Sequence, residues 1–272
     1  MRSSIISALI TITGLAAAAP IEDRSSNAIG DATILNYALT LEYLERKFYQ
    51  EGLVNYTEAD FTAAGAPAPF YANLKEIYVD EQTHVSTLAG ALKAAGATPV
   101  KEAMYSFPVK DAKSFLGLSS VLEGVGVSAY LGAAGEIANK AYLTVAGSIL
   151  TVEARHSAYI RAGLKQVPFP KPFDTPLDFN QVFSLAAQFI TGFAPGDAAL
   201  PFKAFPAISV AYAGSSVTFK NAQKNAMAAG LCTSSTPVYA VFFSGLDTYY
   251  VKATAGGGDF RVAKVPVGAE GQ

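Results

Sequence analysis

Histidine, cysteine and tryptophan are nearly absent from this sequence of 272 residues, which has two histidines, one cysteine and no tryptophan. The single cysteine, Cys232, excludes an internal disulfide, and we interpret it as a small buried hydrophobic residue. Charged residues make up only 15%, the net charge is −2, and no Lys/Arg cluster is present, so we expect no nucleic-acid partner. Hydrophobic residues make up 51%, which is enough for a large core.

Long hydrophobic runs are also scarce, apart from one at the N-terminus. Arg2 precedes an apolar stretch over 5–15 and small residues over 16–19, which is typical of a secretory signal peptide cleaved after Ala18. The apolar stretch is about half of the ~20 residues that cross a bilayer, and no later run is long and apolar enough to cross one. We therefore expect a signal peptide over 1–18, no membrane span, and a product that is extracellular or in the cell wall. A sequon at Asn55, expected in a loop after the first helix, predicts glycosylation.

The two histidines share the same local pattern. Glu81 precedes His84 by three residues, and Glu153 precedes His156 by three. Positions i and i+3 lie on one face of a helix, so the carboxylate and the imidazole can bind the same metal ion. Two such pairs that face each other, with one further glutamate from each of two other helices, make the dinuclear site of a carboxylate-bridged helical bundle.

Two further segments repeat a second pattern. Glu42 is followed seven residues later by Tyr49, and Glu123 is followed seven residues later by Tyr130, each after a Leu-Glu pair. Seven residues are two helical turns, so each tyrosine lies on the face of its glutamate. The chain therefore has, twice in order, a helix with Leu-Glu-x6-Tyr and a helix with Glu-x-x-His. This order predicts a duplicated helical hairpin that closes into a four-helix bundle.

Apolar periodicity and capping residues place these patterns on four helices, expected over 31–51, 70–95, 111–134 and 137–165. Gly52 is expected to end the first helix, and a loop follows over 57–69. Small residues crowd the second half of the third helix, which predicts a close helix–helix contact. A short fifth helix is expected over 178–190. Runs at 210–219, 238–243, 248–253 and 260–265 predict antiparallel strands, with a helix over 221–231.

Four motifs together resemble the ferritin-like superfamily, namely ALTLEYLERKFY, DEQTHV, LEGVGVSAYLGAA and VEARH. Within that superfamily the chain is similar to the secreted ferritin-like group of plant desiccation-related and fungal stress-response proteins. The resemblance covers about 31–190. It implies a mainly α fold, with a ferritin-like four-helix bundle and a short fifth helix over 28–192. A small β-rich C-terminal region over 193–272 is expected to follow.

The resemblance implies a dimetal site with six ligands: Glu42, Glu81, His84, Glu123, Glu153 and His156. Glu45 is an alternative to Glu42, from which it is one turn away, but it has no counterpart on the third helix. Glu76 and Glu136 point to other helix faces and are excluded.

Three residues are expected to surround the ligands. Asp80 resembles the aspartate that orients the histidine of the opposite hairpin, here His156. Val152 stands at the equivalent place in the other hairpin, so His84 would need a different partner. Tyr49 and Tyr130 either hydrogen-bond a ligand carboxylate, take part in redox chemistry, or fill the core.

Carboxylates and imidazoles suit iron or manganese, with zinc as a further occupant. Our leading hypothesis is redox chemistry on peroxide, oxygen or Fe(II), in stress response or metal handling, with a small oxidant or a metal ion as partner. The alternative is a non-enzymatic stress-related protein, in which the metal only stabilises the bundle or a surface of the β-rich tail binds a wall polymer or a partner. A homo-oligomer or a wall component is a further expectation.

Overall fold

The computed structural model describes residues 29–197 and 200–269. The predicted signal peptide over 1–18 lies outside the described residues. The helical segments are α1 (Asp31–Asn55), α2 (Glu58–Ala63), α3 (Phe70–Ala94), α4 (Ala112–Ala133), the 3-10 turn η1 (Ala134–Glu136), α5 (Lys140–Gly163), α6 (Phe179–Ala186) and α7 (Ala222–Ala228). The strands are β1 (Met104–Tyr105), β2 (Ile190–Gly192), β3 (Ser209–Ala213), β4 (Ser216–Lys220), β5 (Tyr239–Ser244), β6 (Asp247–Lys252), β7 (Thr254–Gly256) and β8 (Asp259–Val262).

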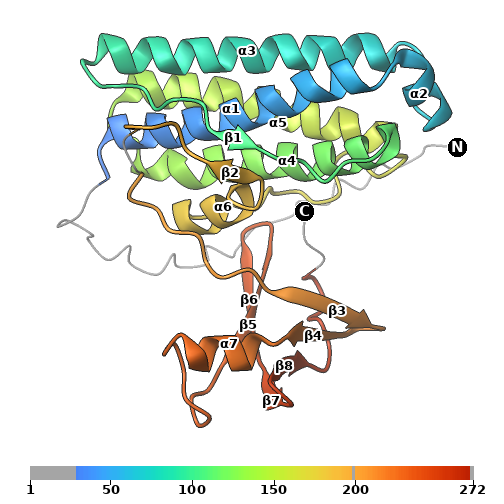
Figure 1. Cartoon of the computed structure of the whole chain (residues 1–272), viewed down its shortest axis with the longest axis vertical. Coiled ribbons are helices and arrows are strands. Elements are labelled where there is room, and N and C mark those ends of the chain that lie inside the picture. Colours follow the sequence, from blue (N-terminus) through green and yellow to red (C-terminus); the bar gives the residue numbers. More distant parts are fainter. Residues whose placement is uncertain (1–28, 198–199, 270–272) are drawn as a thin grey trace, which may run out of the picture.

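The four long helices form a bundle made of two hairpins (Figure 1). Helix α1 packs along α3, α4 packs along α5, and the two hairpins meet mainly through α1 and α4. The segment between α3 and α4 runs along the bundle, and its strand β1 pairs with β2, which follows α6. The predicted four-helix bundle with a short fifth helix is confirmed.

Polar caps fix where the helices begin. Asp111 and Ser114 form a capping box at the start of α4, and Asn139 accepts a hydrogen bond from the backbone N–H of Ala141 at the start of α5. The carboxylate of Asp31 accepts from the backbone N–H groups of Ala138 and Asn139, both at 2.9 Å, and so joins the start of α1 to the start of α5. Helix α5 therefore begins at Lys140, after the turn η1, and not at 137 as the periodicity predicted.

Gly52 does not end the first helix, and that prediction is wrong. Helix α1 continues through Gly52 to Asn55, because the glycine is a packing residue: a Cβ at this position would lie 2.0 Å from the Phe115 ring. Asn55 is therefore the last helical residue, although it is exposed as the sequon requires. The predicted loop over 57–69 contains α2, which a capping box of Thr57 and Asp60 begins.

Small residues on α4 do not all serve a helix–helix contact. A Cβ on Gly132 would lie 1.9 Å from the backbone oxygen of Leu177, whose own N–H donates to the Ser128 carbonyl at 3.2 Å. The close neighbour of Gly132 is therefore the segment that follows α5 and leads to α6, so the predicted helix–helix contact is wrong at this position. The missing side chain lets this segment pack directly on α4.

Aromatic residues fill the bundle core beside the polar layer described below. Phe48 of α1 stacks on Phe115 of α4 with ring centroids 4.4 Å apart. Tyr37 of α1 makes edge contacts with Phe179 of α6 and Phe202, so that α6 and the chain after it cover one side of the bundle. Burial of such large side chains contributes about 1.5 to 3 kcal/mol each.

The C-terminal region forms small antiparallel sheets below the bundle in Figure 1. One sheet has the strand order β3-β4-β8-β7, and β5 and β6 pair as a separate hairpin. The run at 210–219 is a hairpin of β3 and β4, because Gly214 turns the chain with a φ of 58°. The predicted helix over 221–231 is present as α7. Cys232 is half-buried, so its interpretation as a buried residue is wrong.

One described helical stretch, Ala112–Glu136, is long and apolar enough to cross a membrane by length and composition. This finding differs from the expectation that no such stretch follows the N-terminus. Within the protein, 56% of the apolar window is buried, and its helix α4 is a core element of the bundle. Burial of that kind is typical of the central helix of a globular bundle.

Candidate metal centre

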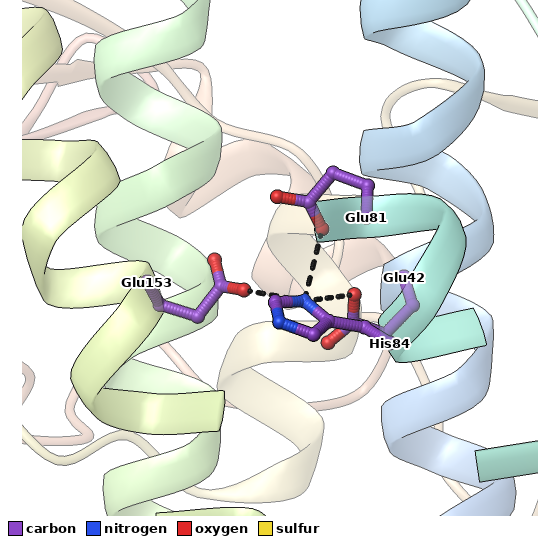
Figure 2. A group of neighbouring side chains, drawn as sticks. All are labelled: Glu42, Glu81, His84 and Glu153. Carbon is purple, nitrogen blue, oxygen red and sulfur yellow. Dashed lines mark hydrogen bonds and ion pairs between the residues drawn. The ribbon is translucent and has the colours of Figure 1, made fainter. Parts of the chain in front are cut away.

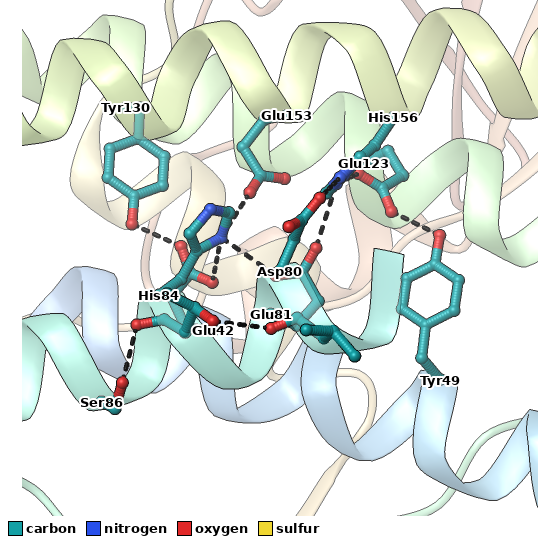
Figure 3. Close-up of polar contacts among 12 residues, drawn as sticks. Glu42, Tyr49, Asp80, Glu81, His84, Ser86, Glu123, Tyr130, Glu153 and His156 are labelled. Carbon is teal, nitrogen blue, oxygen red and sulfur yellow. Dashed lines mark hydrogen bonds and ion pairs between the residues drawn. The ribbon is translucent and has the colours of Figure 1, made fainter. Parts of the chain in front are cut away.

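The six predicted ligand side chains come together in the middle of the bundle (Figure 3). Each of the four long helices contributes: α1 carries one glutamate, α4 carries one, and α3 and α5 each carry a Glu-x-x-His pair. The glutamates are fully buried and the two histidines are 6–7% exposed. The buried residues of the site are Glu42, Glu81, His84, Glu123, Glu153 and His156.

One half of the site surrounds His84 (Figure 2). Its Nδ1 atom lies 3.2 Å from Glu42 Oε2, 3.3 Å from Glu81 Oε2 and 3.1 Å from Glu153 Oε1. Ligand atoms of these four residues all lie within 4.8 Å of one another. Three carboxylates and one imidazole nitrogen thus converge on a single point, as a divalent ion requires.

The other half surrounds His156 and shares two carboxylates with the first. His156 Nδ1 lies 3.1 Å from Glu81 Oε1 and 3.4 Å from Glu123 Oε2. Glu81 and Glu153 belong to both four-residue groups, and the two imidazole rings are 6.4 Å apart between centroids. Glu81 directs one carboxylate oxygen toward each histidine. These two groups would hold two cations close together, with Glu81 and Glu153 available to both.

The residues present fit a pair of cations. Among the described residues, several buried site atoms make no hydrogen bond: Glu81 Oε1, Glu123 Oε2, Glu153 Oε1, Glu153 Oε2 and His156 Nδ1. Three of the carboxylate oxygens lie 3.1 to 3.4 Å from a histidine nitrogen, but the geometry of these contacts is not that of a hydrogen bond. A buried polar atom without a partner costs about 1 to 3 kcal/mol, so five in one place need an explanation. Coordinated metal ions would satisfy all of them.

Two tyrosines hold the outer glutamates in position. The Tyr49 hydroxyl donates a hydrogen bond to Glu123 across the bundle, and the Tyr130 hydroxyl donates to Glu42. Both tyrosines are buried, and each comes from the helix that carries the other tyrosine's glutamate. Of the three roles considered for them, the structure therefore shows two: each ring is part of the buried core, and each hydroxyl contacts a carboxylate.

Asp80 contacts the outer nitrogen of one histidine only. His156 Nε2 lies 3.0 Å from Asp80 Oδ2, which fixes the ring with Nδ1 toward the carboxylates. Within the described part of the chain, His84 Nε2 has no equivalent protein partner. Val152 occupies the place that an aspartate would need for symmetry.

A seventh carboxylate, Glu45, lies beside the ligand groups. It is 3% exposed, and its Oε2 atom makes no hydrogen bond within the described residues. A Cβ on Gly126 would lie 2.9 Å from Glu45 Oε1 and 3.0 Å from Glu153 Oε2, so the absence of a side chain at Gly126 leaves room for both carboxylates. Glu45 belongs to neither four-residue group, whereas Glu42 does. The excluded Glu76 and Glu136 are exposed.

Burial dominates the acid–base behaviour of the metal-free carboxylates. Desolvation raises the pKa of Glu42 to about 8 and raises the pKa values of Glu123, Glu153 and Glu45, the last two well above their ordinary range. Burial also acts on Glu81, but the two imidazoles beside its carboxylate, those of His84 and His156, outweigh that effect and lower its pKa to about 2. Without metal, several of these glutamates therefore hold protons.

The histidines respond in the opposite sense. Burial alone would lower their pKa values, but the surrounding carboxylates outweigh it, raising the pKa of His156 to about 12 and that of His84 further. In the metal-free protein both imidazoles are cations inside a carboxylate cage. Metal ions bind neutral imidazoles and ionised carboxylates, so metal binding would release protons from these side chains.

A family comparison agrees with this geometry. A sequence model of the ferritin-like domain family matches residues 30–166, half of the chain. The chain belongs to the ferritin-like domain family. The matched segment of this ferritin-like chain contains all four long helices and all six side chains of the candidate site.

This ferritin-like protein is also similar to protein rds1 of Schizosaccharomyces pombe, with 25% identity over 178 residues. The match covers 65% of this chain and 44% of that protein, so the chain spans less than half of its relative's length.

Proposed function

We propose that this ferritin-like protein holds two iron or manganese ions in the bundle and uses them for redox chemistry on oxygen, peroxide or Fe(II). The observation that carries the proposal is the pair of buried groups that share Glu81 and Glu153. Iron or manganese bound there would supply one-electron steps next to a small oxidant. Zinc fits the same donors but has no redox chemistry of its own.

The chain's own residues support that chemistry in three ways. Carboxylates shared between the two groups hold both positions close together. The hydroxyls of Tyr49 and Tyr130 keep the outer glutamates from rotating, and burial excludes bulk water from the site. The histidines and several of the glutamates would lose protons on binding metal, because the ligand forms of these side chains are deprotonated.

Protein reconstituted separately with iron and manganese tests the proposal. We expect elemental analysis to give two ions per chain, and we expect the loaded protein to consume hydrogen peroxide or to oxidise Fe(II). Glu81→Gln replaces a carboxylate shared by both groups with a neutral amide and should abolish the turnover. Glu76→Gln makes the same change on the exposed face of the same helix and should leave the turnover unchanged. Two bound ions without either activity would contradict the redox proposal.

A second candidate function is structural, and one observation favours it. The six side chains come from all four helices of both hairpins, so bound ions would cross-link the whole bundle. Ligand binding to the folded state alone raises stability by mass action. A large rise in the melting temperature with metal, together with no consumption of peroxide or Fe(II), would favour this function.

The biological setting is part of the proposal. The resemblance to secreted desiccation-related and stress-response proteins supports a role in stress or metal handling outside the cell. Secretion rests on the sequence pattern at 1–18. Release of the mature chain into the medium, with its N-terminus after Ala18, would be expected on expression with the native leader.

A further inference from the structure

A cavity of about 130 Å³ lies between α1, α4 and α6, on the side of the metal centre where Glu45 is located. Apolar side chains make up most of its wall: Leu41, Leu44, Leu122, Val125, Ala186 and Phe189. At one end are Val121 and Gln188, which are exposed. At the other end are Glu45, which is 3% exposed, and Gly126. The cavity therefore joins the surface of the bundle to a buried carboxylate.

The inner end of the cavity adjoins the metal centre. Gly126 is the residue whose missing side chain leaves space beside Glu45 Oε1 and Glu153 Oε2, and Glu153 belongs to both ligand groups. The duplicated pattern makes this space visible, since Glu45 lies three residues after Glu42 and Gly126 lies three residues after Glu123. Helix α1 thus carries an extra carboxylate, Glu45, at the position where α4 carries Gly126, which has no side chain.

We propose that this cavity is the route by which a small uncharged molecule, oxygen or hydrogen peroxide, reaches the Glu153 side of the centre. The inference rests on the redox function proposed above. An apolar wall disfavours hydrated cations, since loss of their water is not compensated until Glu45 is reached. Apolar cavities of comparable size, about 150 Å³, admit uncharged guests such as xenon and benzene.

Glu45 is the polar group that an entering molecule meets. Its Oε2 atom has no hydrogen-bond partner among the described residues, so it is available to a peroxide at the inner end. Ala186 is the last residue of α6 and Phe189 lies in the segment just after it, so the short fifth helix forms one wall of the route. This gives α6 a role beyond covering the bundle.

A crystal of the metal-free protein under xenon pressure tests the route without any turnover. We expect a xenon atom between Leu44, Val125 and Phe189. Val121→Trp places a large ring at the exposed end, while Val145→Trp makes the same change on an exposed position of α5 that does not line this cavity. Xenon absent from the cavity in the unaltered protein would overturn the proposal.

Kinetics of the reduced, iron-loaded protein supply the second measurement. Val121→Trp should lower the second-order rate constant for reaction with oxygen or peroxide about tenfold, equivalent to 1.36 kcal/mol of added barrier, with unchanged metal content. Val145→Trp should react like the unaltered protein. Equal rates in the two variants would overturn the route even if xenon binds. No reaction in the unaltered protein would instead refute the redox function, and xenon binding would then decide whether the cavity admits uncharged guests.

Discussion

At the residue scale, the two halves of the metal centre differ although the sequence pattern repeats. Both rings direct Nδ1 toward carboxylates, but only His156 has an aspartate at its other nitrogen. An acceptor on the outer nitrogen raises the basicity of a ligating imidazole and fixes its orientation. The two metal positions should therefore differ in affinity, with the tighter position at His156.

Asp80→Asn should reverse or reduce that difference. Loss of the carboxylate at His156 Nε2 should weaken binding at the His156 position by about 10- to 100-fold, the usual effect of removing such a partner, and leave the His84 position nearly unchanged. Stepwise titration of metal-free protein with Mn²⁺ resolves the two affinities.

Glu76→Gln is the matched control, because it neutralises an exposed carboxylate on the same helix. Equal weakening of both positions by Asp80→Asn would show that the aspartate acts on the whole centre, contrary to this prediction.

Residue identities at the centre could be read from the sequence because metal chemistry restricts the donors. Two histidines, each three residues after a glutamate, already indicate the helical faces that meet. Glu45 was harder to place, since one turn of helix separates it from Glu42 and both face inward. Only the three-dimensional structure shows that Glu45 lies beside the ligand groups and not within them.

At the element scale, the glycines of α4 have different physical reasons. Gly117 is exposed and a Cβ there would meet no neighbour, Gly126 faces two carboxylates, and Gly132 faces the backbone of Leu177. Glycine in a helix lowers the free energy of unfolding by about 1 kcal/mol relative to alanine. A glycine without a close neighbour can therefore be replaced by alanine with a gain in stability.

Alanine substitutions along α4 should separate these roles. Gly117→Ala should raise the free energy of unfolding by about 0.5 to 1 kcal/mol and leave metal affinity unchanged. Gly126→Ala should lower metal affinity about tenfold, comparable to the loss of an outer hydrogen-bond partner, because the new Cβ displaces Glu45 and Glu153. Urea unfolding and Mn²⁺ titration of the metal-free proteins provide both quantities.

Gly132→Ala completes the series, since backbone at Leu177 cannot move aside as a side chain can. It should destabilise the protein with no direct effect at the metal centre. Unchanged metal affinity in Gly126→Ala would mean that the carboxylates have free space on another side.

Helix boundaries were predicted less well than helix faces, and the reasons are local. Gly52 was predicted to end the first helix, because glycine is common just after a helix. The structure shows that glycine is needed there because the ring of Phe115, which is distant in sequence, leaves no room for a side chain. The start of α5 depends on Asp31 of another helix, which binds the backbone just before it. Long-range contacts of this kind leave no periodic pattern in the segment that they affect.

At the scale of the whole molecule, the bundle was predictable and the C-terminal region was predictable only in outline. Duplicated motifs define four helices and their pairing, whereas short strands carry no ligand pattern to fix their partners. The sheet order is β3-β4-β8-β7, and along the chain α7 and the β5-β6 hairpin lie between β4 and β7. This order follows from contacts that the runs of β-branched residues do not encode.

The charge balance of the buried centre should make the stability of the whole metal-free protein depend on pH. The pKa of Glu42 rises from 4.5 to about 8, so the folded chain keeps a proton that the unfolded chain loses as the pH rises above 4.5. The pKa of His156 rises from 6.5 to about 12, so its stabilising contribution is complete below pH 6.5 and declines above it. Glu81, whose pKa is lowered to about 2, acts below pH 4.5 in the opposite sense.

The metal-free protein should therefore be most stable near about pH 5 and should melt at progressively lower temperature toward pH 8 and above. Bound metal takes the place of the protons and needs deprotonated ligands, so the Mn²⁺-loaded protein should have its maximum at higher pH. Melting curves of both forms from pH 4 to about 9 test this, with Glu76→Gln as a control that should follow the unaltered protein. A metal-free melting temperature that rises between pH 5 and 8 would show that the buried glutamates are already ionised. It would contradict the inference that the metal-free site holds protons.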